Sequence, residues 1–180
     1  MLSRFFAGFL AVYQLWDLSA QVIINEIHCD PDIKTERVEF VELFNATPTA
    51  LDVGGWSFTE GVAYTFPAGS SIPAGGYFVA GENPTALLAK FGVTAFGPWI
   101  GNLSSEGERL TLRDAGGNTV DTVGYGFGFP WPTVGDPPGY SMELIHPGLD
   151  NDLGGSWRAS VAGDPSQEAV PQVLVTARSP

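Results

Sequence analysis

The residues that could carry catalysis are two histidines, one cysteine and many carboxylates. His28 precedes Cys29, and His146 precedes Pro147. A serine-type catalytic arrangement needs a histidine, but neither histidine lies near a G-x-S-x-G motif, and HExxH, P-loop and G-x-G-x-x-G motifs are absent from the sequence. His28 and Cys29 are neighbours in a strand pattern, so their side chains point to opposite faces and cannot readily hydrogen-bond. The sequence therefore predicts no catalytic site, and Cys29 is interpreted as structural.

Three glutamates lie beside apolar residues in strand-like runs. These are Glu26, Glu39 and Glu42. In one register Glu42 points inward and needs hydrogen bonds or a positive partner, and Arg37 or Arg109 could serve as that partner. The opposite register buries the apolar residues on either side of Glu42 and exposes it. In either register we interpret the glutamates as structural.

A short acidic run suggests calcium. Asp150, Asn151 and Asp152 follow one another in a loop. Closely spaced Asp and Asn oxygens suit Ca²⁺, but this ion takes 6–8 oxygen ligands, and the run lacks the glycine and the distal glutamate of an EF-hand. An Asx turn explains the same residues equally well. Calcium is the one cofactor that the sequence suggests.

The stretch from 124 to 139 is rich in glycine and proline and cannot form a regular central strand. The aromatic residues in and beside it could present stacking faces to a partner: Tyr125, Phe127, Phe129, Trp131 and Tyr140. Alternatively they fold back and cover one end of the core. Trp131, between Pro130 and Pro132, is the residue that we expect to contribute most to binding, because the prolines restrict its backbone.

Composition limits the class of protein. The 180 residues are 44% hydrophobic and 12% aromatic, which suits one domain with one buried core. With 20 acidic and 8 basic residues, the net charge is −12. This balance argues against nucleic-acid binding, since that affinity comes largely from Lys and Arg beside phosphates. One cysteine excludes an internal disulfide.

Residues 1–20 resemble a secretory signal peptide. Arg4 is followed by an apolar stretch from Phe5 to Leu15, and Ala20 is a small residue at the cleavage position. The apolar stretch is shorter than the roughly 20 residues that a transmembrane helix needs. An ordinary N-terminal helix is the alternative. Export would place the protein outside the cell or at the cell surface.

Several later elements have clear local signals. Residues 108–114 and 119–125 alternate apolar and polar residues around an AGGN turn and predict a hairpin. Residues 84–91 predict a helix, with Asn83 as N-cap and Gly92 at its end. Its apolar face would comprise Leu87, Leu88 and Phe91.

The stretch from 37 to 58 contains two strand-like runs, and the rest of the chain is organised around it. The apolar parity changes at Gly54 and Gly55, which predicts a β-bulge. Such a bulge would turn Trp56 onto the apolar face and make it a central core residue. Trp157 is expected to close the core.

An ordered set of motifs within 22–168 resembles the lamin tail domain family. The motifs include Asn25-Glu26-Ile27, Glu39 to Leu43, Gly55-Trp56, Tyr64 to Gly69 and Ile72 to Tyr77. The resemblance implies an all-β fold, an immunoglobulin-like antiparallel β-sandwich, with the one short helix near residues 84–91. The expected organisation is a signal peptide at 1–20, the domain at 21–168 and a tail at 169–180.

The family fixes a fold better than a function. In bacteria such domains occur in secreted and surface proteins, so we expect a non-catalytic, exported interaction or adhesion module. Its partner would be a protein or a cell-surface polymer, with no nucleic acid and no membrane span. The alternative is an accessory domain of a larger secreted hydrolase or nuclease-type protein. Nuclear lamins bind chromatin through this domain, but the acidic balance argues against that role here.

Overall fold

A computed structural model describes residues 21–135 and 139–160 of the chain. The elements are, in order, β1 (Val22–His28), β2 (Phe40–Asn45), β3 (Leu51–Asp52), β4 (Ser57–Glu60), β5 (Tyr64–Thr65), β6 (Ser71–Ile72), β7 (Tyr77–Gly81), α1 (Pro84–Phe91), β8 (Glu108–Arg113), β9 (Thr119–Tyr125), β10 (Met142–Leu144), a 3-10 turn η1 (Gly154–Ser156) and β11 (Trp157–Ala159). All strand pairs are antiparallel apart from one isolated bridge.

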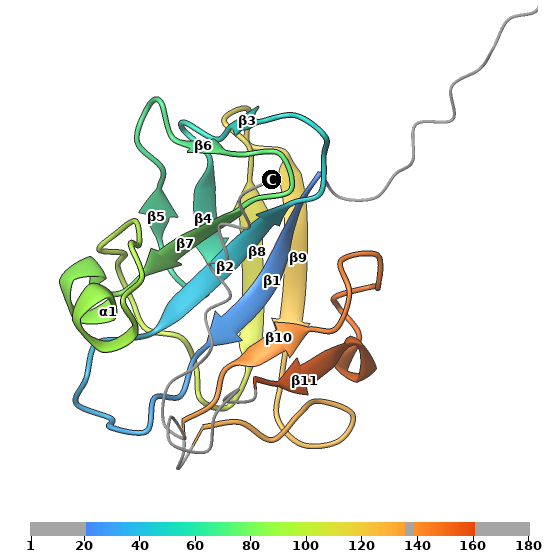
Figure 1. The fold of residues 1–180 in the computed structure, drawn as a ribbon. Helices are drawn as coiled ribbons and strands as arrows, with labels where there is room; N and C mark the ends of the chain where they lie inside the picture. Colours follow the sequence, from blue (N-terminus) through green and yellow to red (C-terminus); the bar gives the residue numbers. More distant parts are fainter. Residues whose placement is uncertain (1–20, 136–138, 161–180) are drawn as a thin grey trace, which may run out of the picture.

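Two sheets make the sandwich (Figure 1). A five-stranded sheet has the order β11-β10-β1-β2-β7, a four-stranded sheet has the order β5-β4-β8-β9, and β3 pairs with β6. The helix α1 lies beside β7 at one edge. The structure therefore confirms the expected all-β, immunoglobulin-like antiparallel sandwich with one short helix.

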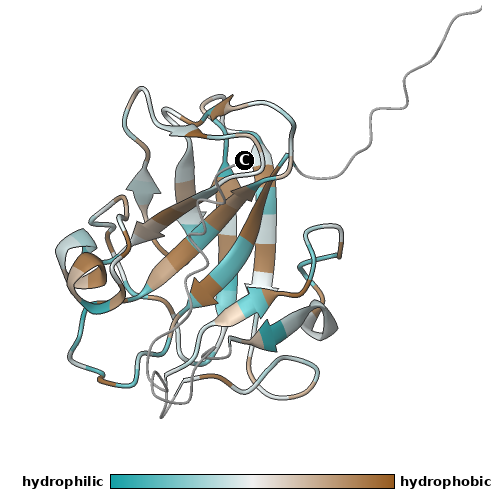
Figure 2. Ribbon diagram, viewed as in Figure 1, coloured by the Kyte–Doolittle hydropathy of each residue, from teal (hydrophilic) through white to brown (hydrophobic). Residues whose placement is uncertain are grey.

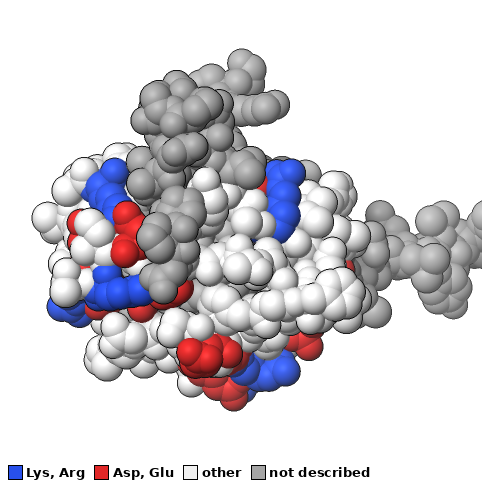
Figure 3. Space-filling view, turned by 90° about the horizontal axis from the view of Figure 1, so that it is seen from below, with Lys and Arg blue, Asp and Glu red and all other residues white. Residues whose placement is uncertain are grey.

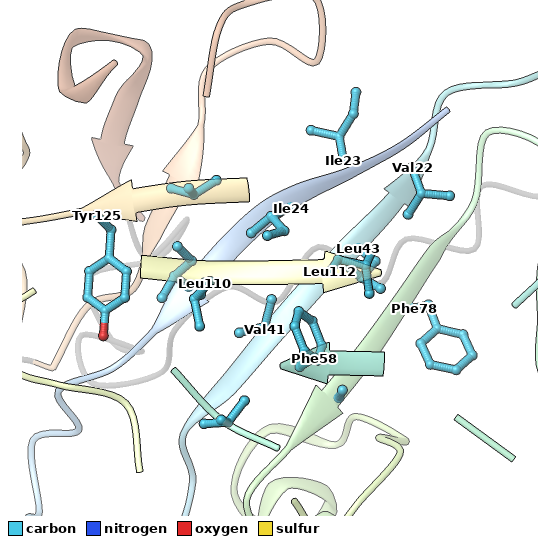
Figure 4. Close-up of a cluster of buried hydrophobic side chains, with 14 of the residues drawn as sticks. Val22, Ile23, Ile24, Val41, Leu43, Phe58, Phe78, Leu110, Leu112 and Tyr125 are labelled. Carbon is cyan, nitrogen blue, oxygen red and sulfur yellow. The ribbon is translucent and has the colours of Figure 1, made fainter. Parts of the chain in front are cut away.

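The core lies between the two sheets and follows the period of two along β2 and β8, whereas a register shift between Ile24 and Glu26 interrupts it in β1. Figure 2 shows hydrophobic and hydrophilic segments alternating along β1 and β2. Figure 4 shows Ile24, Val41 and Leu43 of the five-stranded sheet beside Leu110 and Leu112 of the other. All five are fully buried. Apolar burial of this kind is the main stabilising contribution to such a fold.

Local signals predicted the hairpin and the helix correctly. β8 pairs with β9 around the turn that follows Asp114. In α1, the Asn83 side chain accepts the first free N–H groups, and Gly92 ends the helix with φ +71°. The expected apolar face is wrong in one residue, because Leu88 is about half exposed while Leu87 is fully buried against β2 and β7.

The predicted β-bulge at Gly54 and Gly55 is wrong. The Trp56 N–H donates to the Val53 carbonyl at 3.0 Å, and Gly55 has φ +79°, so these residues form a tight turn between β3 and β4. A turn shifts the alternation of inward-facing and outward-facing residues in the same way as a bulge, so the sequence pattern could not distinguish the two. Trp56 is consequently only partly buried and packs at the margin of the core. Trp157 is buried, as expected.

A buried amide holds the β2–β3 corner. The side chain of Asn45 is fully buried, and its Nδ2 lies 2.8 Å from the Thr49 carbonyl, 3.1 Å from that of Ile72 and 2.9 Å from that of Pro73. Its Oδ1 accepts the Thr47 N–H at 2.9 Å. One side chain thus satisfies backbone groups from two separate loops, which is how a buried corner avoids unpaired polar atoms.

The predicted signal peptide at 1–20 and the tail at 169–180 lie outside the described residues, as does the end of the predicted domain at 168. Among the residues that are described, no helix is long and apolar enough to cross a membrane.

Candidate binding surface at one end of the sandwich

One end of the sandwich gathers four chain segments that are distant in the sequence. β1 and β9 end there, while β2 and β8 begin there (Figure 1). Two features lie on this end: the aromatic loop, defined as residues 126–135 together with Gly139 and Tyr140, and a charged pocket beneath the loop that joins β1 to β2. Figure 3 views the molecule from this end and shows one group of acidic and basic side chains on the side of α1, further charged groups at the lower edge and upper right, and an uncharged area between them.

Tyr125 does not belong to an exposed aromatic surface, which corrects the sequence-based expectation. It is the last residue of β9 and is almost fully buried. Its hydroxyl donates to the Ser104 carbonyl at 2.8 Å and lies 3.1 Å from Glu108 Oε1. Both partners come from the segment at the start of β8, so tertiary contacts turn the ring inward. Tyr125 cannot offer a stacking face to a partner.

Trp131 forms the base of the aromatic loop. It is partly buried, and its ring centroid lies 6.0 Å from that of the buried Trp157. A Cβ atom on Gly154 would lie 2.9 Å from the Trp131 ring, so the indole rests directly on the backbone there. Trp131 therefore packs onto the end of the core, although part of its surface still faces solvent.

Phe129 forms the tip of the same loop. Its side chain is fully exposed, with a relative accessibility of 102%. Directly behind it the Trp131 N–H donates to the Gly128 carbonyl at 2.8 Å and closes a turn. The loop thus presents an unburied phenyl ring on a base held by a packed tryptophan. This geometry is typical of a binding loop on a rigid scaffold.

Phe127 and Tyr140 flank the loop, and both are partly buried. Phe127 packs edge-on against Tyr125, with 6.4 Å between ring centroids. The far end of the loop is fixed at Gly139, whose carbonyl lies 3.0 Å from the buried Nε2 of His28. The loop is therefore anchored at both ends.

His28 and Cys29 form no nucleophilic pair. The two His28 ring nitrogens lie within hydrogen-bond distance of the carbonyls of Val38 and Gly139. Burial lowers the pKa of His28 and raises that of the Cys29 thiol. His28 packs against Phe40 on the outer face of the sheet, whereas Cys29 joins the sandwich core. The two side chains point to opposite faces, as the strand pattern predicts.

The charged pocket has a volume of about 480 Å³. Its walls come from the loop after β1, the end of β7 and the segment before β8, and its lining residues are Cys29, Asp30, Pro31, Lys34, Glu36, Arg37, Glu39, Glu82, Asn102, Leu103 and Ser105. Two ion pairs lie among these lining residues, Lys34 with Asp30 at 2.5 Å and Arg37 with Glu82 at 2.6 Å.

Glu39 differs from the other carboxylates of the pocket. Its exposed fraction is only 8%, and its Oε2 accepts the Leu103 N–H at 2.7 Å. Among the described residues, no lysine, arginine or histidine forms an ion pair with it. Burial raises the pKa of Glu39 to about 7. The sequence singled out Glu39 but not the pocket, because the other walls come from segments far along the chain.

Glu26 and Glu42 are both buried, but neither arginine that the sequence suggested contacts Glu42. Glu42 instead accepts the Asn25 side-chain N–H at 2.9 Å, and Glu26 accepts the Ser141 hydroxyl at 2.5 Å. The observed register buries the apolar neighbours of Glu42 in the sandwich core and places Glu42 on the opposite face, which is also covered. Both registers considered from the sequence assumed that only one face of the sheet is buried.

The proposed calcium ligands do not converge on one point. The side chains of Asp150, Asn151 and Asp152 form hydrogen bonds with different partners. Asp150 Oδ1 accepts the Asp152 N–H at 3.0 Å, which is an Asx turn, and Asp152 Oδ1 accepts the Gly124 N–H at 2.6 Å. Asn151 is buried and donates to Asp121 Oδ2 at 2.8 Å. Within the described part of the chain, no three His, Cys, Asp or Glu side chains are arranged to hold a metal ion. The geometry matches the Asx turn that the sequence left open beside calcium.

Comparison with known families agrees with this architecture. A family model for the lamin tail domain matches residues 18–127, more than half of the chain. The protein therefore belongs to the lamin tail domain family and has an immunoglobulin-like domain. No curated protein matches the chain. The match ends just after β9, although β10 and β11 complete the five-stranded sheet.

Proposed function

We propose that this protein is an exported, non-catalytic interaction module, and that it binds a protein or a cell-surface polymer through the tip of the aromatic loop. The observation that carries the proposal is the full exposure of Phe129 on a loop whose base packs on the core. A solvated phenyl ring loses little conformational entropy and gains apolar contact when a partner covers it.

Other features support this assignment. Family membership supplies a scaffold whose end loops can vary while the sandwich stays rigid. The two ring nitrogens of His28 face backbone carbonyls, and Cys29 is buried, so neither is placed for nucleophilic catalysis. The acidic balance of 20 acidic to 8 basic residues disfavours nucleic acid as the partner.

The experiment measures binding of the fluorescently labelled protein to the producing cells and to their isolated cell-surface fraction. Phe129→Ala should weaken binding by about tenfold or more, as expected for an apolar anchor at the centre of an interface. Ile100→Ala is the matched control, since Ile100 is also an exposed apolar residue (78%) but lies outside the aromatic loop. Equal binding by both variants and the unchanged protein would contradict the proposal.

A further inference from the structure

We propose that the charged pocket binds a cationic side chain of a partner protein, a lysine ammonium or an arginine guanidinium, and that Glu39 is the group that pairs with it. This assigns a ligand class to a second site, separate from Phe129. The inference can therefore fail while the proposed function stands, and the reverse also holds.

The lining of the pocket carries an excess of negative charge. Four carboxylates face two cations. Asp30 and Glu82 each have their own cation, Lys34 and Arg37 respectively. A third ion pair, at the rim of the pocket, joins Glu36 to Lys90 of α1. Every lining carboxylate except Glu39 therefore has a cation beside it.

Glu39 is almost completely buried in the wall of this pocket. A carboxylate that is 92% removed from solvent is unfavourable unless a cation or several hydrogen bonds compensate it. Glu39 accepts one backbone N–H, from Leu103, at 2.7 Å. A carboxylate has about four lone-pair positions, so it can accept further donors from a ligand in the pocket. The pocket volume of about 480 Å³ accommodates a long basic side chain.

An organic cation suits this pocket better than a metal ion does. A divalent metal ion needs several convergent protein ligands, and the described residues contain no suitable group of three His, Cys, Asp or Glu side chains. An ammonium or guanidinium group instead brings its own N–H donors and needs only one carboxylate with neighbouring acceptors. Asn102 and Ser105 line the same pocket and carry such acceptors.

Binding of a cation beside Glu39 should release a proton from its carboxyl group. The acidic groups that act on Glu39 are Glu82 after β7, Glu108 at the start of β8 and Asp30 after β1. Cys29 and Tyr125 also lie within its electrostatic reach, and Lys34, Glu36 and Arg37 are the remaining charged lining groups. Burial, assisted by these acids, raises the pKa of Glu39 to about 7. A cationic ligand favours the ionised form, so binding should strengthen as the pH rises through 7.

The pocket also adjoins the aromatic loop. Gly135 has φ +89°, and a Cβ atom on it would lie 2.0 Å from Asp30 Oδ2. The loop backbone therefore runs directly against one wall of the pocket. A partner that covers the loop would bring its own side chains to the pocket mouth.

The experiment titrates the full chain with Nα-acetyl-lysine N-methylamide and follows the Leu103 amide by NMR. We expect a saturable shift at Leu103, and an affinity about tenfold higher at pH 8 than at pH 6, because a group with a pKa near 7 changes from mostly protonated to mostly ionised. The same compound with an acetylated ε-amine has no charge and should not bind. Both comparisons use the unaltered protein, so they do not depend on the folding of a variant.

Two variants complete the test. Glu39→Gln should abolish the saturable shift, while Glu106→Gln, which removes an equal charge from an exposed position outside the pocket, should bind as the unaltered protein does. Equal weakening by both variants would assign the effect to overall charge and overturn the proposal. Equal binding of the neutral compound, or an affinity that does not rise with pH, would also overturn it.

Discussion

Glu26 and Glu42 lie directly opposite each other on the adjacent strands β1 and β2, on the face of the sheet that points away from the sandwich core. Glu143 on β10 is the next residue in the same row, opposite Glu26. At the end of the row, Arg158 donates to Glu143 at 2.5 Å. Carboxylates opposite one another repel when ionised, so the row is stable only if part of it is protonated.

This row predicts that stability falls as the pH rises from about 6.5 to 9. Burial raises the pKa of Glu42 to about 8 and that of Glu26 well above its ordinary value. The folded state then holds protons that the unfolded state has lost, so the stabilisation is present at low pH and disappears as the pH passes the folded pKa. Thermal melts across this range measure it.

Glu42→Gln is the control for the pH dependence. The amide keeps the shape of the side chain and cannot ionise, so the variant should show a shallower decline in Tm above pH 6.5 than the unaltered protein. Below that pH, buried His28 acts in the opposite direction, because its pKa is lowered and protonation favours unfolding. Parallel curves for the two proteins would show that Glu42 does not titrate in this range.

Trp131 and Phe129 should separate stability from binding. Trp131→Ala removes packing on Trp157 and should cost about 2 kcal/mol, which lowers Tm by about 4–8 °C. Phe129→Ala removes a ring that contacts solvent and should leave Tm within about 1 °C. Calorimetry of both variants measures the difference. A stable Trp131→Ala variant would show that the indole does not support the core.

The sequence predicted the elements whose signals are local. Asn83 and Gly92 flank α1 as expected, and the β8–β9 hairpin forms around its predicted turn. The Gly54-Gly55 turn was misassigned because a turn and a bulge produce the same change of parity. The sequence did not reveal which side chains are buried by contacts with distant segments of the chain. Tyr125 is turned inward by partners near the start of β8.

The charged pocket illustrates the same limit. The sequence singled out Glu39 but neither Glu82 nor Leu103, and only the fold brings the three residues to one cavity. The alternating pattern around Glu42 predicted the strand correctly. Our interpretation of Glu42 was incomplete, because we expected one face of the sheet to contact solvent. Both faces are buried there, so a period of two could not decide its environment.

Asn45→Ala should destabilise the fold by about 2–3 kcal/mol. The change removes the side chain that satisfies the carbonyls of Thr49 and Ile72 and the N–H of Thr47, and buried groups without partners cost the most. Urea denaturation measures the loss. Thr59→Ala, at an exposed position on β4, is a control that should change stability by less than about 0.5 kcal/mol. A similar small effect at Asn45 would contradict this role.

Cys29 should resist thiol reagents in the folded protein. Its side chain is buried and burial raises its thiol pKa, so little reactive thiolate forms. Labelling with a chromogenic disulfide reagent at pH 8 should be slow in buffer and rapid in urea. Rapid stoichiometric labelling without denaturant would show that the segment after β1 opens readily.

The central claim is that partners bind at the tip of the aromatic loop. Its most direct test places a photo-crosslinking amino acid at position 129, or at position 100 as the exposed control, and irradiates the protein on the producing cells. We expect a discrete crosslinked species at position 129 that is lost when excess unlabelled protein competes, and none at position 100. Crosslinks of equal yield at both positions, or none at 129, would contradict it.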